Sequence, residues 1–421
     1  MVKRDYKKMA FIGGQLITGT GEDAIQDSVV LVDNGKIVYA GSRAGAPDTQ
    51  WYEERDITGK TIMPGLCDAH LHFSGNLTDN SSDWVNEPNE QKTVIAVQQA
   101  RECIEHGLTL VGEISRQGIF IRDMITDGHM RGPRMVCTGR GFCATASHGD
   151  SRHCSQEANW ASHPWAETVD GPWDLRKAVR RKLRESPDAI KIWATGGDIN
   201  RWDTARHQHY TLEEIQAVVD EAAMRGIPVW SHCYGPATDS IKAGVDLIIH
   251  GFVLEDEDID VMVEKGIPLC TTINFLPAWL ATYPPKYHPM VHDKYEGDTV
   301  VEKELNKIYS AMKRAHENGV MLVTGSDSFN SDSTPFGVTL IGEIHALVDH
   351  CGLTEMEAIM AGTSNGAKAL ESYFLTGSVT RGKCADLLVI DGDPLKDIHD
   401  ICVENMDVIM KDGEMFRDRL C

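Results

Sequence analysis

The sequence predicts an α/β protein, a (β/α)8 barrel that carries a small β domain built from both ends of the chain. Short apolar runs recur eight times across the middle of the chain and alternate with amphipathic helical segments. The two ends contain short β segments and tight turns instead, without long helical periodicity. The chain has 421 residues, which is enough for one large barrel with an attachment.

Both ends of the chain share one pattern. The N-terminal end has β segments over residues 9–19, 28–41 and 54–63, and the C-terminal end has them over 377–394 and 406–416. An Asn-Gly pair at 34–35 and an Asp-Gly pair at 412–413 lie between apolar segments, which is a hairpin signal. We therefore predict a composite β domain of residues 1–62 plus 373–421, with the barrel inserted as residues 63–372.

The eight apolar runs are the predicted barrel strands. They span residues 66–73, 108–114, 134–139, 189–196, 227–233, 245–251, 267–273 and 320–327. Amphipathic helices are predicted between them. Thr211 with Glu214, and Thr354 with Glu357, have the spacing of a capping box at two of the helix starts.

Composition excludes several classes of partner. Lys and Arg total 41 and Asp and Glu total 63, so the net charge is −22. Such a surface repels phosphate backbones and anionic lipid, so we expect a small-molecule substrate and neither nucleic acid nor membrane as a partner. We also expect a cytoplasmic protein, because there is no long apolar stretch or signal peptide, and the eleven cysteines form no C-x-x-C pair.

Two histidines on the first predicted strand are candidates for chemistry. His70 and His72 are two residues apart, so in a strand their side chains point to the same face. In a barrel strand that face is the interior. The pair is either half of a metal site or two hydrogen-bonded core histidines.

The ends of the other strands favour the metal site. His232, His250 and Asp327 end the fifth, sixth and eighth predicted strands. Lys191 lies among apolar neighbours in the fourth, where an unpaired ammonium is costly, so its amine loses its proton, reacts, or forms an internal ion pair. A neutral lysine amine can add carbon dioxide to give a carbamate. Because active sites of barrels lie at the C-terminal ends of strands, these side chains together predict a site there.

Several segments resemble the metal-dependent amidohydrolase superfamily. They are PGLCDAHLH (64–72), IKIWATGG (190–197), SHCYG (231–235), DLIIHG (246–251), TGSD (324–327) and the tail from TSNGAKAL (363–370) to GSVTRGKCADLLVIDGDPL (377–395). The resemblance covers nearly the whole chain. It implies that the composite β domain is a β-sandwich and that the barrel holds a binuclear centre.

The resemblance also implies a role for each candidate ligand. His70, His72 and Asp327 would hold one divalent metal ion, and His232 and His250 the other. Carboxylated Lys191 and a hydroxide would bridge the two ions. We expect zinc, although imidazole and oxygen ligands also suit manganese, cobalt and iron.

Within the superfamily the chain is most similar to prolidase-like and Xaa-Arg or Xaa-Lys dipeptidases, with N-acyl amino-acid hydrolases nearby. This branch implies hydrolysis of an amide bond next to a carboxylate, with Asp327 passing a proton from the hydroxide to the leaving nitrogen. It also implies that His148 contacts the carbonyl or tetrahedral oxygen, and that Tyr234 contacts the oxyanion or the substrate carboxylate. Without the resemblance, His148 is as well explained by a structural hydrogen bond and Tyr234 by a satisfied phenol at the barrel mouth.

Other readings stay open. The same chemistry suits a cyclic amide, an imidazolone, or a urea or carbamate, and a non-catalytic barrel that serves as an assembly module is the remaining alternative. The acidic surface and nine tryptophans are compatible with the homo-oligomer that we expect.

Three loops add candidates for the substrate pocket. The loop after the fourth strand holds Arg201, Arg206, His207 and His209, where an arginine could clamp a carboxylate, but loop arginines are more often solvated and we assign none to the site. The long polar loop after the first strand is a candidate lid. The aromatic and proline-rich loop after the seventh strand is a candidate wall of an apolar pocket or an oligomer contact.

Overall fold

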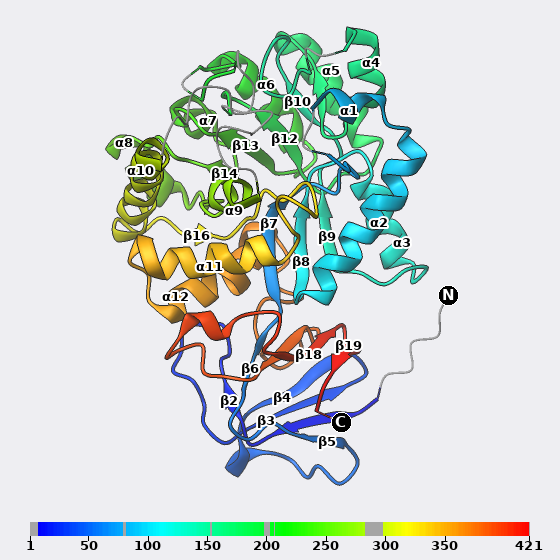
Figure 1. Ribbon diagram of the computed structural model, residues 1–421, viewed down its shortest axis with the longest axis vertical. Coiled ribbons are helices and arrows are strands. Elements are labelled where there is room, and N and C mark those ends of the chain that lie inside the picture. Colours follow the sequence, from blue (N-terminus) through cyan, green and yellow to red (C-terminus); the bar gives the residue numbers. More distant parts are fainter. Residues whose placement is uncertain are drawn as a thin grey trace.

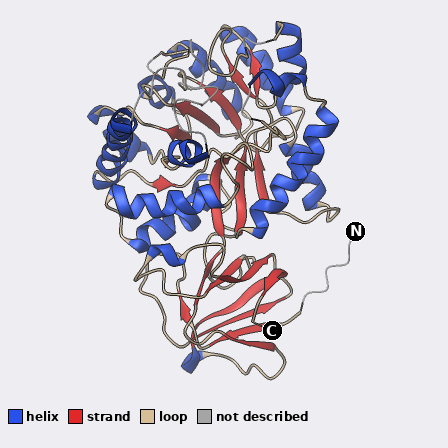
Figure 2. Ribbon diagram, in the orientation of Figure 1, coloured by secondary structure: helices blue, strands red, loops and turns tan. Residues whose placement is uncertain are grey.

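The computed structural model describes residues 7–78, 81–151, 154–197, 203–205, 207–282 and 298–420. A helix-covered barrel forms the larger part, and strands from the two ends of the chain lie together below it (Figure 1). Figure 2 shows that this smaller part consists mainly of strands and the loops that join them, whereas helices surround the larger one. The predicted fold class is confirmed. The predicted domain boundaries at 62/63 and 372/373 stay a prediction.

The smaller part contains two sheets. One has the order β4-β3-β1-β5 and consists of Lys36–Ser42, Ser28–Asp33, Met9–Ile12 and Glu53–Asp56. The other has the order β19-β18-β17-β6-β2 and consists of Glu414–Asp418, Met406–Lys411, Leu387–Ile390, Thr61–Pro64 and Gln15–Leu16. In the second sheet β6 pairs antiparallel with β17, so the two ends of the chain share one sheet. Buried side chains of both sheets, such as Phe11 and Leu387, belong to one apolar cluster.

Both predicted hairpins are confirmed. Asn34 and Gly35 join β3 to β4 with φ of 51° and 76°, and Asp412 and Gly413 join β18 to β19 with φ of 51° and 74°. Positive φ at both turn residues matches the right-handed twist of the strands, and Asn, Asp and Gly tolerate it best.

The barrel is built from parallel strands. Its two sheets have the orders β7-β8-β9 and β11-β10-β12-β13-β14-β15-β16, and all pairs in them are parallel. The strands are Leu66–Leu71 (β7), Leu108–Glu113 (β8), Arg134–Cys137 (β9), Gly141–Cys143 (β10), Ala166–Thr168 (β11), Ile190–Trp193 (β12), Val229–Cys233 (β13), Leu247–His250 (β14), Leu269–Cys270 (β15) and Leu322–Val323 (β16). The segment after β16 closes the ring on β7, because the Asp327 N–H donates to the His70 carbonyl at 2.8 Å and the His72 N–H to the Ser328 carbonyl at 2.8 Å.

Each of the eight predicted strands is present, within shorter bounds. The predicted third strand ends at Cys137. Residues 138–140 belong to no strand, and β10 then continues the barrel wall. Sequence analysis did not predict β10 or β11, because three-residue strands are too short to show a period.

Helices cover the outside of the barrel. They are α1 (Ser81–Asn86), α2 (Asn89–Glu105), α3 (Gly118–Thr126), α4 (Gln156–Ser162), α5 (Pro172–Leu183), α6 (Leu212–Ala223), α7 (Thr238–Ala243), α8 (Asp256–Lys265), α9 (Phe275–Thr282), α10 (Asp298–Glu317), α11 (Val338–Cys351), α12 (Glu355–Met360) and α13 (Gly366–Ala369). The predicted capping boxes are present at the starts of α6 and α12. Among the helices of the described residues, none is both long enough and apolar enough to cross a membrane.

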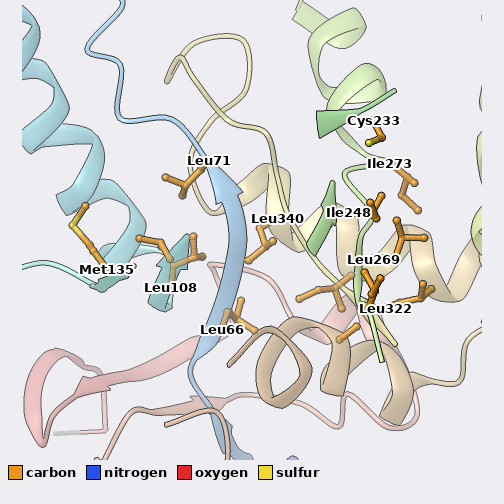
Figure 3. Close-up of a cluster of buried hydrophobic side chains, with 14 of the residues drawn as sticks. Leu66, Leu71, Leu108, Met135, Cys233, Ile248, Leu269, Ile273, Leu322 and Leu340 are labelled. Carbon is orange, nitrogen blue, oxygen red and sulfur yellow. The ribbon is translucent and has the colours of Figure 1, made fainter. Parts of the chain in front are cut away.

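Alternate residues of the strands face two different apolar clusters. Ile248 of β14 belongs to the cluster between strands and helices, part of which Figure 3 shows, including Leu71 of β7 and Leu269 of β15. Its neighbours Leu247 and Ile249 belong to the cluster inside the barrel. On β12 the outward residues are Ile190 and Ile192, so the residue between them points into the barrel.

Candidate functional site

Six side chains converge at one mouth of the barrel, where β7, β12, β13 and β14 end and the chain leaves β16. They are His70, His72, Lys191, His232, His250 and Asp327. The five nitrogen donors are buried, and the aspartate side chain is 13% exposed. These are the six candidate ligands of the sequence prediction, and they lie at the predicted end of the barrel.

The two histidines of β7 face one carboxylate oxygen. Nε2 of His70 and Nε2 of His72 each lie 3.1 Å from Oδ1 of Asp327. The Nδ1 atom of His72 lies 2.7 Å from the carbonyl oxygen of Ile114, which fixes Nδ1 as the donor and turns Nε2 toward the site. Burial would raise the pKa of Asp327, but its interactions with His70 and His72 hold it well below its usual value. This group therefore presents an ionised carboxylate beside two imidazoles.

His232 and His250 form a second group beside the first. Nε2 of His250 lies 2.9 Å from Nδ1 of His232, so two ring nitrogens face each other. The other nitrogen of His250, Nδ1, lies 2.6 Å from Oγ1 of Thr272. Burial lowers the pKa of both histidines well below the usual value, so both rings are neutral and have a lone pair for a cation.

Strained backbone places several of these residues. His250, Thr272 and Asp327 have φ of 75°, 50° and 55°. Positive φ is uncommon for residues other than glycine and costs free energy unless the surroundings impose it. The three residues lie where strands end, so the chain turns sharply there and aims these side chains at the barrel axis.

Lys191 is fully buried, and its amine has no hydrogen-bond partner in the part of the chain that the structure describes. The interior-facing position on β12 puts Nζ 5.3 Å from the centre of the Trp193 ring. Burial lowers the pKa of Lys191 to about 7, although the charge of Asp327 opposes this shift. The internal ion pair that sequence analysis left open is absent, since no carboxylate lies within bonding distance of Nζ among the described residues.

His148 lies in the loop after β10 and stacks on His232, with ring centres 4.7 Å apart. Its Nδ1 lies 2.5 Å from Oδ2 of Asp203, which also accepts the N–H of Gly197 at 3.0 Å. A Cβ atom at Gly197 would lie 2.2 Å from the His148 ring, so only glycine permits this approach. Asp203 therefore orients His148 so that Nδ1 donates to the carboxylate.

Tyr234 lies one residue beyond β13 and packs against the second group of histidines. Its ring centre is 5.3 Å from that of His232 and 4.3 Å from that of His250. Phe252 packs against its other side at 4.7 Å. Tyr234 is thus beside the site, as predicted, and its role toward a substrate stays a prediction.

A pocket opens at this mouth of the barrel and has aromatic walls. It is lined by His70, His72, His148, His232 and Asp327 and by Trp84, Trp165, Trp193, Phe275 and Phe329. The candidate lid contributes Trp84 through α1, and the loop after β15 contributes Phe275 through α9. Of the arginines in the fourth loop, Arg201 and Arg206 lie outside the described residues.

The donor set fits divalent metal ions. One atom each from His70, His250 and Asp327 lie within 4.8 Å of one another, so the two histidine groups meet beside one carboxylate at the spacing of metal ligands. The Lys191 amine is the second fitting feature, because it is a buried polar atom without a hydrogen bond to any described residue.

Sequence analysis missed the residues that support this site. Asp68 is fully buried, and its Oδ1 accepts the N–H groups of His70 and Ser326 at 3.1 and 3.0 Å, which ties β7 to the end of β16. Burial raises the pKa of Asp68 to about 7. The position of Asp68 within PGLCDAHLH (64–72) was a signal for this role, whereas nothing in the sequence indicated Asp203 or Thr272.

The architecture defines a class of protein. A (β/α)8 barrel with imidazole, lysine and carboxylate groups at its strand ends, beside a β domain built from both termini, is the arrangement of metal-dependent hydrolases. A model of the amidohydrolase family matches residues 61–416. The chain therefore belongs to the amidohydrolase family.

Particular members resemble the chain over nearly its full length. It is 27% identical to ochratoxinase of Aspergillus niger over 423 aligned positions, which cover 94% of this chain and 83% of that protein. The crystal structure of A. niger ochratoxinase has a TM-score of 0.86 at 23% identity and covers 99% of this chain and 96% of that one. The crystal structure of a Xaa-Pro dipeptidase with bound methionine has a TM-score of 0.85 at 27% identity and covers 98% of this chain and 100% of that one.

Proposed function

We propose that the protein is a metal-dependent hydrolase that cleaves an amide bond next to a carboxylate, in a dipeptide or an N-acyl amino acid. The observation that carries this proposal is the convergence of four histidines and an aspartate on one pocket beside an unpartnered lysine. The similarity to a Xaa-Pro dipeptidase supports the substrate class, because a dipeptide has an amide bond next to a carboxylate.

The candidate ligands divide into two groups. His70, His72 and Asp327 would hold one divalent ion, and His232 and His250 the other. When bound, two divalent ions polarise an amide carbonyl and lower the pKa of a shared water. We propose zinc as the metal.

Lys191 would join the two groups as a carbamate. The bond forms between Nζ and the carbon of carbon dioxide, and one proton leaves the amine, so a potential cation becomes an anion with two donor oxygens. The buried, unpartnered amine supports this assignment, as does its electrostatic interaction with His70, His232 and His250.

The remaining residues would handle the proton and the substrate. Asp327 is proposed to accept a proton from the attacking water on a carboxylate oxygen and to deliver it to the leaving nitrogen. His148, oriented by Asp203, would donate to the developing oxyanion from Nε2. Tyr234 would donate its phenolic O–H to the oxyanion or the substrate carboxylate.

Metal analysis is the first test. We expect two equivalents of metal per chain by inductively coupled plasma mass spectrometry, loss of activity on chelation, and recovery when zinc and bicarbonate are added together. Protein that carries no divalent metal and gains no activity under these conditions would favour the non-catalytic assembly module.

A substrate panel is the second test. We expect hydrolysis of dipeptides and N-acyl amino acids by the reconstituted enzyme. Activity on imidazolonepropionate, aryl ureas or carbamates without activity on acylated amino acids would reverse the assignment in favour of the alternative substrates.

Replacement of Asp327 tests the proton transfer separately. The change Asp327→Asn keeps an oxygen donor but removes the base, so we expect kcat to fall by at least about 100-fold in a variant reloaded with metal. A variant with both metals and most of its kcat would remove Asp327 from this role.

A further inference from the structure

The aromatic side chains over the site form one continuous wall that begins at a candidate metal ligand. The ring of Trp165 lies 5.1 Å from that of His72, and Trp84 lies 4.7 Å from Trp165. Phe329 lies 5.8 Å from Trp84, and Phe275 lies 6.2 Å from Phe329. The wall therefore presents edges and faces of rings to the space in which a substrate would meet the ligands.

The wall is assembled from elements that are far apart in the sequence. Trp84 comes from α1, Trp165 from the segment between α4 and β11, and Phe329 from the segment after β16. Both α1 and α4 are short helices, of six and seven residues. The carbonyl of Trp165 accepts the N–H of Gly141 in β10 at 2.9 Å, and Nε1 of Trp84 donates to the carbonyl of Thr78 at 2.8 Å, but neither bond joins α1 to α4.

Lys92 joins α1 to α4. It lies in the first turn of α2, is fully buried, and its Nζ donates to the carbonyl oxygen of Trp84 and, at 3.1 Å, to that of Ser162. Both acceptors lie in the last turn of a short helix, α1 or α4, where carbonyls lack partners within the helix. The ammonium thus joins the C-terminal ends of the two helices that carry or adjoin the tryptophans.

A charged lysine at position 92 is unfavourable for the stability of the fold unless other groups compensate it. A cation in the first turn of a helix opposes the helix dipole, and burial of an ammonium is unfavourable unless hydrogen bonds compensate. A surface lysine on the same helix would avoid both costs. The two carbonyl acceptors and the attraction to Glu87 therefore offset part of the cost of a lysine at this buried position.

We propose that the site takes amides that carry an aromatic group, and that Lys92 is the positioning residue that holds the tryptophan part of the aromatic wall. The preference for aromatic substrates in turnover rests on the proposed amide hydrolysis. The preference for aromatic ligands in binding rests on the geometry of the wall alone. The ring of the substrate would pack against Trp84 and Trp165 while its amide carbonyl faces the histidines.

Binding tests the wall without requiring any turnover. Calorimetry with the metal-loaded protein compares phenylacetate with cyclohexylacetate, which has similar size but no aromatic face. We expect phenylacetate to bind more tightly by about fivefold or more, since aromatic pairs add to plain apolar burial. Equal affinities, or tighter binding of cyclohexylacetate, would overturn the aromatic preference even if the protein hydrolyses amides.

Kinetics test Lys92. The ratio of kcat/KM for N-acetyl-L-phenylalanine over N-acetyl-L-alanine should fall about tenfold or more in Lys92→Met, mainly through KM of the aromatic substrate, with metal content unchanged. The matched control is Lys177→Met, an exposed lysine on α5, which should leave the ratio as in the wild type. An unchanged ratio in folded Lys92→Met would overturn its positioning role.

Trp84→Leu is the second variant, in case Lys92→Met does not fold. It keeps the backbone carbonyl that Lys92 binds and removes only the ring, so the preference for phenylacetate over cyclohexylacetate should shrink at least about threefold. A preference equal to that of the wild type would contradict the wall. Failure of all acylated amino acids as substrates would contradict the proposed function, and the two binding comparisons would still decide the inference.

Discussion

Thr272 offers a sharp test of how the second histidine group is built. Its Oγ1 lies 2.6 Å from Nδ1 of His250, and both residues are fully buried. The change Thr272→Val keeps the branched shape and removes the acceptor. The Nδ1–H of His250 would then lack a partner, which costs about 1–3 kcal/mol because water cannot replace the lost bond.

The expected loss of metal affinity follows from this magnitude. A change of 1.4 kcal/mol is tenfold in an equilibrium constant, so we expect Thr272→Val to bind one of the two proposed metal ions about 10–100-fold more weakly, as is usual when the partner of a ligating histidine is removed. The loop itself should persist, since Glu343 accepts the N–H groups of Ile273 and Asn274 at 2.9 and 2.6 Å.

The assay is competition with a chelator, followed by metal analysis and by thermal unfolding of the metal-free protein. Thr272→Ser is the matched control because it keeps the hydroxyl, and it should retain affinity close to that of the wild type. If the valine variant held both ions as tightly as the serine variant, Thr272 would not orient His250 for metal binding.

For three further substitutions we predict the direction of the change in the free energy of unfolding. Lys191→Met should stabilise the metal-free protein by about 1 kcal/mol or more at pH 7 while abolishing activity, because it removes a buried amine without a partner among the described residues. The pKa of Lys191 in the folded protein is lowered to about 7, so between pH 7 and 10.5 the unfolded chain binds one proton more than the folded protein. In urea titrations, the stability gained by the Met variant should therefore shrink as the pH rises through that window. Arg134→Met should lower the free energy of unfolding by about 3 kcal/mol in urea titrations, since Arg134 of β9 forms buried ion pairs with two aspartates of the β domain, and a loss below about 0.5 kcal/mol would show that these pairs do not stabilise the contact. Gly118→Ala should destabilise the protein by about 2 kcal/mol or more, because a Cβ there would lie 1.4 Å from the buried Glu113 carboxylate, and an unchanged melting temperature would contradict the overlap.

The strands and the candidate ligands could be predicted because both depend on local pattern. The eight predicted barrel strands lie in largely apolar runs, and the two-residue spacing of His70 and His72 places both on one face, as their shared contact with Asp327 shows. The hairpins and capping boxes were predictable for the same reason, since a turn or a helix start depends on a few adjacent residues.

What the sequence did not indicate depends on contacts between distant segments. The positive φ at His250 and Asp327 is imposed by the surrounding structure, because neither residue type announces it as glycine would. Likewise Asp203 meets His148, and Trp84 meets Trp165, only after the loops have folded over the barrel. Such pairings have no period along the chain from which they could be predicted.

The pairing of β6 with β17 has a consequence for biosynthesis. Residues 61–64 leave the ribosome long before residues 387–390, their partners in the sheet. Until translation is nearly complete, the hydrogen-bonding edge of β6 that β17 later covers is open, and open edges invite association with other nascent chains. A chaperone that shields this edge during synthesis would therefore raise the yield of native protein, and a chain cut off before β17 would aggregate even though its barrel segments were intact.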